Sequence, residues 1–145
     1  MLYEKAKGDI ITSGLDRTAR KINEASDIDL EITYVTDRRD FYRRLVENPS
    51  GYDIAVLHVS GGESVPESRR LTTYSLADEI KTTDFVGKLV AESGVTESGL
   101  SATTISRIKR DLSQHFDYHT DRLYYSGNLV RMLIAFRFLP EDFCL

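Results

Sequence analysis

Apolar segments alternate with amphipathic ones through the first sixty residues of the chain. Ile54 to Val59 is almost continuously aliphatic, which is typical of a strand covered on both faces. Leu30 to Val35 alternates apolar and polar residues, as a half-exposed strand does. Asp9 to Thr12 is a short run rich in β-branched residues. These patterns predict strands at 9–12, 30–35 and 54–59.

The segments between these strands have the spacing of helices. Apolar side chains recur at near-helical intervals from Leu15 to Ala25. Asp37 is suited to cap a second helix, with Phe41 and Leu45 on one face. Strands that alternate with helices in this way form parallel sheets with right-handed connections. We therefore expect an α/β fold that begins with a small parallel βαβαβ sheet in the strand order 2-1-3.

The second half of the chain has a helical or mixed α+β pattern. Ser64 and Glu67 have the spacing of a capping box, and Pro66 suits a first helical turn. A helix is therefore predicted to begin at Pro66. Thr83 can begin another helix, with the apolar residues from Phe85 to Val90 facing inward.

Two further elements complete the second half. Ser101 can cap an amphipathic helix. Its apolar positions are three, four and four residues apart: Ile105, Ile108, Leu112 and Phe116. Leu123 to Tyr125 and Leu129 to Leu139 flank a turn at 126–128, which predicts a closing β-hairpin. The run from 129 to 139 is equally compatible with a buried helix.

Length and composition restrict the class of protein. The 145 residues fit one domain, 1–145, with 1–62 as the βαβαβ half and 63–145 as the helical or mixed half. The net charge of -4 opposes a chain-wide attraction to nucleic acid. The single cysteine, Cys144, excludes an internal disulfide and favours a cytoplasmic location. No apolar run reaches the length of about 18 residues that a membrane span needs.

The ends of the first and third predicted strands form the best candidate for a binding site. In open parallel sheets, ligands bind outside the carboxyl ends of the strands, where glycine lets the backbone come close. The residues concerned are Ser13, Gly14, His58, Ser60, Gly61 and Gly62. Backbone N–H groups here can face an anion, and Arg17 or Arg38 can supply positive charge. The alternative interpretation is a loop that only reverses the chain.

The three histidines suggest a second kind of site. His115 and His119 are four residues apart, so both rings project from one face if the helix that begins near Ser101 extends that far. His58 at a strand end would supply a third nitrogen, and a zinc ion held by the three would activate water for hydrolysis. The alternative is that His115 and His119 only lie at the carboxyl end of a helix, where positive charge is favoured.

A third hypothesis concerns DNA. The span from Val86 to Leu112 contains two predicted helices, the second of which carries hydroxyl and arginine side chains between Thr103 and Arg110. This is the general layout of a helix-turn-helix, although the turn is longer than usual. The alternative is a pair of packed helices with polar outer faces.

The spacing of the first and third predicted strands resembles that of a response-regulator receiver or another flavodoxin-like domain. The resemblance implies a doubly wound sheet. Where a receiver has acidic residues and a phosphorylated Asp at the ends of these strands, this chain has Ser13-Gly14 and His58-Val59-Ser60. The chain after Gly62 also shows no clear fourth and fifth parallel strands. We therefore expect the topology without phosphotransfer.

These patterns favour a non-catalytic regulatory or protein-interaction module with a small-ligand crevice at the strand ends. Its expected partner is another protein or a small anionic ligand, with no membrane and no required cofactor. A zinc-dependent hydrolase that uses His58, His115 and His119 is the alternative, and a DNA-binding regulator that uses the helix from Thr103 to Arg110 is the second alternative.

Overall fold

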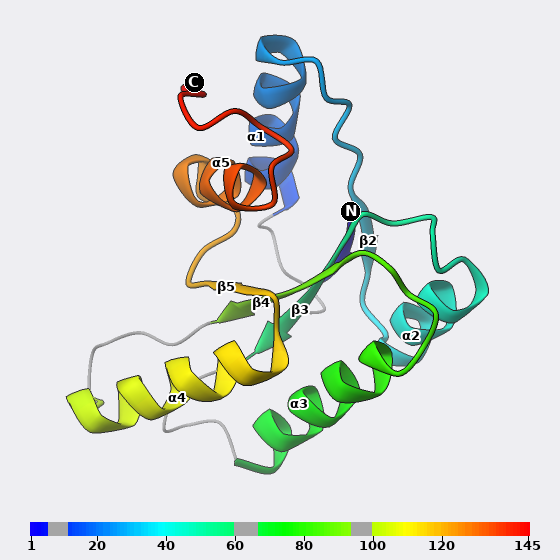
Figure 1. Cartoon of the computed structure of the whole chain (residues 1–145), viewed down its shortest axis with the longest axis vertical. Coiled ribbons are helices and arrows are strands. Elements are labelled where there is room, and N and C mark those ends of the chain that lie inside the picture. The colour runs from blue at the N-terminus through cyan, green and yellow to red at the C-terminus, as the bar shows by residue number, and fades with distance from the viewer. Residues whose placement is uncertain (6–11, 60–66, 94–99) are drawn as a thin grey trace.

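The computed structural model describes residues 1–5, 12–59, 67–93 and 100–145 (Figure 1). Within these residues, all strands run parallel in one sheet with the order β2-β1-β3-β4-β5. The strands are β1 (Leu2–Glu4), β2 (Thr33–Val35), β3 (Ile54–Val59), β4 (Lys88–Ser93) and β5 (Tyr118–Thr120). This is the flavodoxin-like order, and it contains the predicted arrangement 2-1-3.

Helices cover both faces of the sheet, as Figure 1 shows. They are α1 (Thr12–Ala25), α2 (Arg38–Glu47), α3 (Glu67–Lys81), α4 (Ala102–His115) and α5 (Ser126–Ala135). Buried side chains of α1 and α5 pack in one hydrophobic cluster, and those of α2, α3 and α4 pack in another. The sheet therefore separates an α1/α5 face from an α2/α3/α4 face. None of the helices in the described ranges is long and apolar enough to cross a bilayer.

β3 occupies the centre of the sheet between β1 and β4, as its aliphatic sequence predicts. Ala55, Leu57 and Val59 point into the α2/α3/α4 cluster, and Ile54 and Val56 point into the α1/α5 cluster. All five are at most 2% exposed. Alternation in a strand sends successive side chains to opposite faces, so a strand covered by helices on both sides must be apolar at nearly every position.

The first two strands differ from the prediction. The strand predicted at 9–12 is wrong at Thr12, which begins α1, and residues 9–11 lie outside the described residues. The first strand of the sheet is instead Leu2–Glu4, whose three residues are too few to show a periodic pattern. β2 begins at Thr33 and is shorter than predicted, and the N–H and C=O of Leu30 bond to the Asn23 side chain instead, at 2.7 and 3.0 Å.

The helix predicted from Thr83 is wrong. Lys88–Ser93 is β4, and its Leu89 and Ala91 face one cluster while Val90 faces the other. A short run of apolar residues fits a buried strand and a buried helix equally well, so periodicity cannot separate them. The sheet accordingly has the fourth and fifth parallel strands that the sequence did not reveal.

The remaining helices follow the sequence patterns closely. Ser101 caps α4, and Ile108 and Leu112 are buried against the sheet. α3 is confirmed from Glu67, and its predicted start at Pro66 lies outside the described residues. The closing hairpin is wrong and the helical alternative is confirmed as far as Ala135, because α5 begins at Ser126, within the predicted turn, and continues to Ala135.

Ser101→Ala is expected to lower the free energy of unfolding by about 1 kcal/mol, because the Ser101 hydroxyl accepts a hydrogen bond from the Thr104 N–H at 3.2 Å. Urea denaturation measures this difference. Ser101→Asp keeps an acceptor at the same position and serves as the matched control. Equal losses in the two variants would show that the cap contributes nothing.

Candidate binding site at the carboxyl edge of the sheet

Buried polar side chains gather where the strands end. Six polar or charged side chains are buried within the described residues. Thr18 lies in α1, and the others lie at or beside the carboxyl ends of the strands: Glu4, Thr73, Glu92, Ser93 and Thr120. Burying a polar group lowers stability unless it is hydrogen-bonded, and among the described residues no buried side-chain nitrogen or oxygen atom lacks a partner.

Arg38 links three elements at this edge. Its guanidinium donates to both carboxylate oxygens of Glu4 at 2.7 and 3.2 Å, to the His58 C=O at 3.0 Å and to the Thr73 hydroxyl at 2.8 Å. Glu4 ends β1, His58 lies in β3 and Thr73 belongs to α3. The first residue of α2 therefore holds the ends of two strands and one helix together.

The Glu4 carboxylate also replaces part of the ladder between β1 and β3. The pairing of these strands ends at Tyr3 and Val56. Beyond that pair, the N–H of His58 donates to Glu4 Oε1 at 3.0 Å. A side chain thus satisfies a backbone donor at the point where the strand order reverses, which is where ligands bind in sheets of this order.

A row of polar side chains lies on the opposite face of the same edge. His58 is in register with Glu92, and Glu92 is in register with Thr120. Residues paired in this way point to the same side of a sheet, and here that side is the α1/α5 face, because Val56 and Val90 two residues earlier lie in that cluster. The Tyr3 hydroxyl donates to the Glu92 carboxylate.

α1 is fixed above this row near its first turn. The Tyr34 hydroxyl donates to Asp16 Oδ1 at 2.6 Å, and Tyr34 pairs with Tyr3 beside the end of β1. Burial raises the pKa of Tyr34, and the hydrogen bond to Asp16 raises it further. Ser13 and Gly14 belong to the first turn of α1, and Ser13 is exposed.

The structure accordingly places three of the predicted crevice residues and leaves three outside the described ranges. His58 lies near the end of β3, and Ser13 and Gly14 lie in α1 rather than in a turn before it. Ser60, Gly61 and Gly62 are outside the described residues. Arg38, which the sequence offered only as a source of positive charge, lies at the centre of the site.

The histidines predicted to bind zinc do not come together. α4 ends at His115, so the prediction that His115 and His119 share a helix face is wrong. His119 lies in β5 on the α2/α3/α4 face, where its Nε2 is 3.3 Å from the Ser113 hydroxyl, whereas His58 points to the opposite face. No group of three metal-binding side chains is found among the residues that the structure describes.

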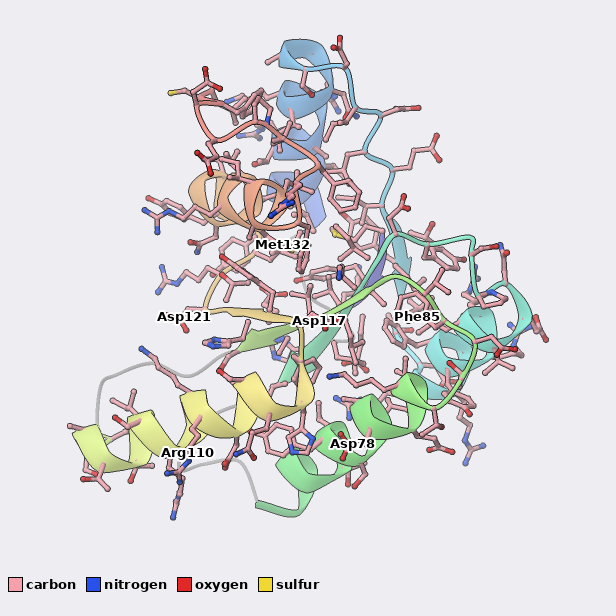
Figure 2. The ribbon with its side chains drawn as sticks, in the orientation of Figure 1. Asp78, Phe85, Arg110, Asp117, Asp121 and Met132 are labelled. Carbon is pink, nitrogen blue, oxygen red and sulfur yellow. The ribbon has the colours of Figure 1, made fainter. Side chains whose placement is uncertain are left out.

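His115 instead joins two helices. Its Nδ1 is 2.7 Å from Asp78 Oδ1 of α3, and its ring stacks on Tyr74 with centroids 4.7 Å apart. Figure 2 shows Asp78 on α3 beside α4. This arrangement accounts for His115 as a packing residue between α3 and α4.

The helix-turn-helix interpretation is wrong in its first helix, because Lys88–Ser93 is a strand of the central sheet. The second helix exists as part of α4. Arg107 and Arg110 are exposed on it, and Arg110 points away from the sheet in Figure 2. Thr103 to Arg110 is therefore a polar outer face without the partner helix that the DNA-binding motif requires.

Most of the residues that form the site were not selected from the sequence. Glu4 and Glu92 each lie at the end of a short apolar run, which is a detectable signal because a carboxylate next to core residues is seldom buried without a partner. Tyr3, Thr73 and Thr120 carry no such signal. Their place depends on strand register and on the packing of α3.

Both buried carboxylates at the edge already accept hydrogen bonds, Glu4 from Arg38 and Glu92 from Tyr3.

No protein-family model matches this chain, and neither curated proteins nor solved structures give a significant match.

Glu4→Gln is expected to lower the free energy of unfolding by about 1 to 3 kcal/mol, because the Arg38 guanidinium then loses its counter-charge in a half-buried setting. Urea denaturation measures the change. Asp40→Asn is the matched control, since Asp40 pairs with Arg43 and Arg44 on the surface of α2, where ion pairs contribute little. Equal effects of the two variants would contradict a special role for Glu4.

Tyr34→Phe is expected to lower the free energy of unfolding by about 1 kcal/mol near neutral pH. Because the pKa of the Tyr34 phenol is raised in the folded protein, its stabilising effect is complete below the ordinary pKa of about 10 and declines as the pH rises above it. The difference between wild type and variant should therefore be smaller at about pH 11 than at about pH 7. A difference that grows with pH would contradict the assignment.

Proposed function

We propose that this protein is a non-catalytic regulatory or protein-interaction module that binds a small anionic ligand at the carboxyl edge of its sheet. The observation that carries the proposal is the Arg38 network, which gathers β1, β3 and α3 around one guanidinium. A packing role alone would be met by apolar residues at lower cost. A protein partner would contact the same edge.

Both buried carboxylates of this edge, Glu4 and Glu92, already have hydrogen-bond partners, which favours an anionic ligand over a cationic one. Glu4 is neutralised by Arg38, and Glu92 is hydrogen-bonded to the Tyr3 phenol. The Arg38 side chain is still 33% exposed, and four of its five N–H groups are accounted for by bonds to described residues. His58 is half-buried at the same edge, and its ring, which lies on the opposite face of the sheet from the Arg38 guanidinium, can donate a hydrogen bond there.

The place of the site in the fold gives independent support. The order β2-β1-β3 reverses direction at β1, and the crevice at such a point is the usual ligand site of doubly wound sheets. α1 follows β1, so the N–H groups of its first turn add favourable potential for negative charge. We also propose a cytoplasmic location, since Cys144 is a free, exposed thiol.

Titration of the full chain with inorganic phosphate tests the proposal. We expect saturable amide chemical-shift changes at Ser13, Gly14 and His58. His58→Ala should weaken phosphate binding about tenfold, the effect of one lost hydrogen bond to a charged group. His119→Ala is the matched control, because His119 lies on the other face of the sheet and should leave the affinity unchanged.

Two outcomes would contradict the proposal. If phosphate leaves the amides of the carboxyl edge unmoved, or if both histidine variants bind it equally well, the anion site is wrong. If the protein hydrolyses p-nitrophenyl phosphate and His58→Ala abolishes that activity, the module is an enzyme and the non-catalytic part of the proposal is wrong.

A further inference from the structure

Three polar side chains form a row across β3, β4 and β5 at the carboxyl edge of the sheet. His58, Glu92 and Thr120 are paired in register, and all three point to the α1/α5 face. Neighbouring strands lie about 4.8 Å apart, so the row extends about 10 Å from the His58 position to the Thr120 position. The row is therefore long enough to contact two different groups of one small ligand.

Thr120 is the member of the row whose polar group the fold does not use. The residue is 8% exposed, yet its hydroxyl forms no hydrogen bond with any residue that the structure describes. Within the described residues, no fully enclosed side-chain oxygen lacks a partner, so the small exposed part of Thr120 includes this oxygen. A nearly buried hydroxyl without a partner lowers stability. The Thr120 hydroxyl is thus directed toward the one side from which a ligand atom can reach it.

The Glu92 carboxylate lies next to Thr120 in the row and is 3% exposed. It accepts a hydrogen bond from the Tyr3 hydroxyl, and a carboxylate has about four acceptor positions, so it can accept from a ligand as well. A ligand hydroxyl suits this pair of side chains, because it can donate to the carboxylate and accept from the threonine. A phosphoryl group does not suit it, because the carboxylate repels negative charge.

The other end of the row suits negative charge. The His58 ring is half-buried and forms no hydrogen bond with a described residue, so its N–H is available to a ligand. Lys5 directly follows β1, and its N–H continues the ladder with β2 by donating to the Val35 C=O at 2.9 Å. The alternation that directs Tyr3 to the α1/α5 face directs Lys5 to the same face. The first turn of α1 adds favourable potential there.

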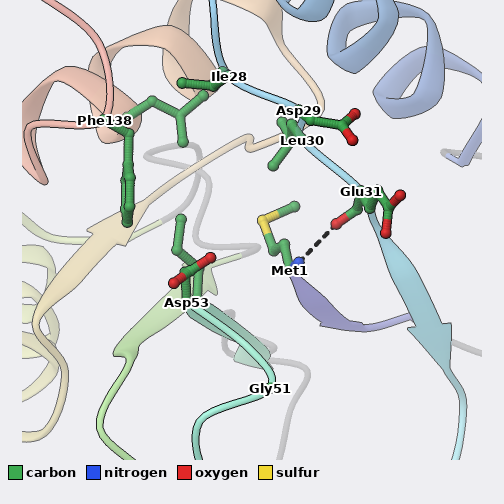
Figure 3. Close-up of a pocket in the computed structure, with 10 residues that line it drawn as sticks. Met1, Ile28, Asp29, Leu30, Glu31, Gly51, Asp53 and Phe138 are labelled. Carbon is green, nitrogen blue, oxygen red and sulfur yellow. Dashed lines mark hydrogen bonds between the residues drawn. The ribbon is translucent and has the colours of Figure 1, made fainter.

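The amino edge of the sheet provides a comparison within the same molecule. A pocket of about 280 Å³ opens at that edge (Figure 3). Its acidic lining residues, Asp29, Glu31 and Asp53, are exposed, and the Met1 amino group donates to the Glu31 C=O at 2.6 Å. The buried polar side chains of the described residues lie elsewhere, in α1 and at the carboxyl edge. The backbone amides around this pocket are therefore suitable negative controls.

We propose that the anionic ligand of the carboxyl edge also carries a hydroxyl group, separated from its charge by a short carbon chain, as in a polyol monophosphate. This inference rests on the proposed function, because it adds a second contact to the same anion site. The phosphoryl group lies near His58 and Lys5, and the hydroxyl lies between Glu92 and Thr120. One strand spacing of about 4.8 Å separates these two places, which a short carbon chain can span.

Titration of the full chain with glycerol 3-phosphate and with n-propyl phosphate, followed by amide chemical shifts, tests this inference. The two probes carry the same charge on chains of the same length, and only the first has hydroxyl groups on its carbon chain. We expect glycerol 3-phosphate to bind at least about fivefold more tightly, the effect of one added hydrogen bond. The amides of residues 28–31 and 53, at the amino edge, should be unmoved by either probe.

Substitutions of one side chain separate the two contacts. Thr120→Val removes the hydroxyl and keeps the branched shape, so it should abolish the preference for glycerol 3-phosphate and leave the affinity for n-propyl phosphate unchanged. Thr120→Ser keeps a hydroxyl and should retain the preference. Thr33→Val is the matched control, because Thr33 begins β2 at the amino edge and should alter neither affinity.

The outcomes distinguish this inference from the proposed function. If glycerol 3-phosphate, n-propyl phosphate and inorganic phosphate all leave the amides of the carboxyl edge unmoved, the anion site is wrong and the hydroxyl contact is wrong with it. If the two organic phosphates bind equally well, the anion site stands and the hydroxyl contact is wrong. A preference that persists in Thr120→Val would also overturn the hydroxyl contact.

Discussion

The burial of β3 on both faces is the constraint on which the rest of the structure depends. Five of its six side chains are covered by helices, so the strand tolerates polar groups only near its end. His58 is the one residue of β3 that is only half-buried, so a polar side chain is tolerated there. The Glu4 and Arg38 side chains act on the backbone of His58, and its own ring joins the row with Glu92 and Thr120. The candidate site is thus a direct result of where the core stops.

Elements with long or clear patterns could be predicted from the sequence. β3, α2 and α4 each bury a periodic set of side chains, and the caps Asp37 and Ser101 mark two of their starts. Shorter elements could not be predicted. β1 has three residues, and the apolar residues at 89–91 of β4 suit a helix as well as a strand until strand pairing decides between them.

Some residues of the candidate site could likewise be predicted from the sequence, and others could not. His58 was found because it lies at the end of an unmistakable strand, and Arg38 was named, with Arg17, as a source of positive charge from an adjacent strand end. Glu4 and Glu92 could not be placed, because their strands were misplaced or taken for a helix. The separation of His58 from His119 depends on register, since one residue of shift would send a ring to the other face.

Arg38 has one further consequence, which concerns movement. Its guanidinium contacts β1, β3 and α3 at the same time, so it cannot turn toward solvent without releasing Thr73 or the His58 carbonyl. The ends of β1 and β3 are therefore mechanically coupled to α3 through one side chain. Through the His115–Asp78 contact, α3 is in turn connected to α4, and a displacement at the strand ends has a physical route to the outer helices.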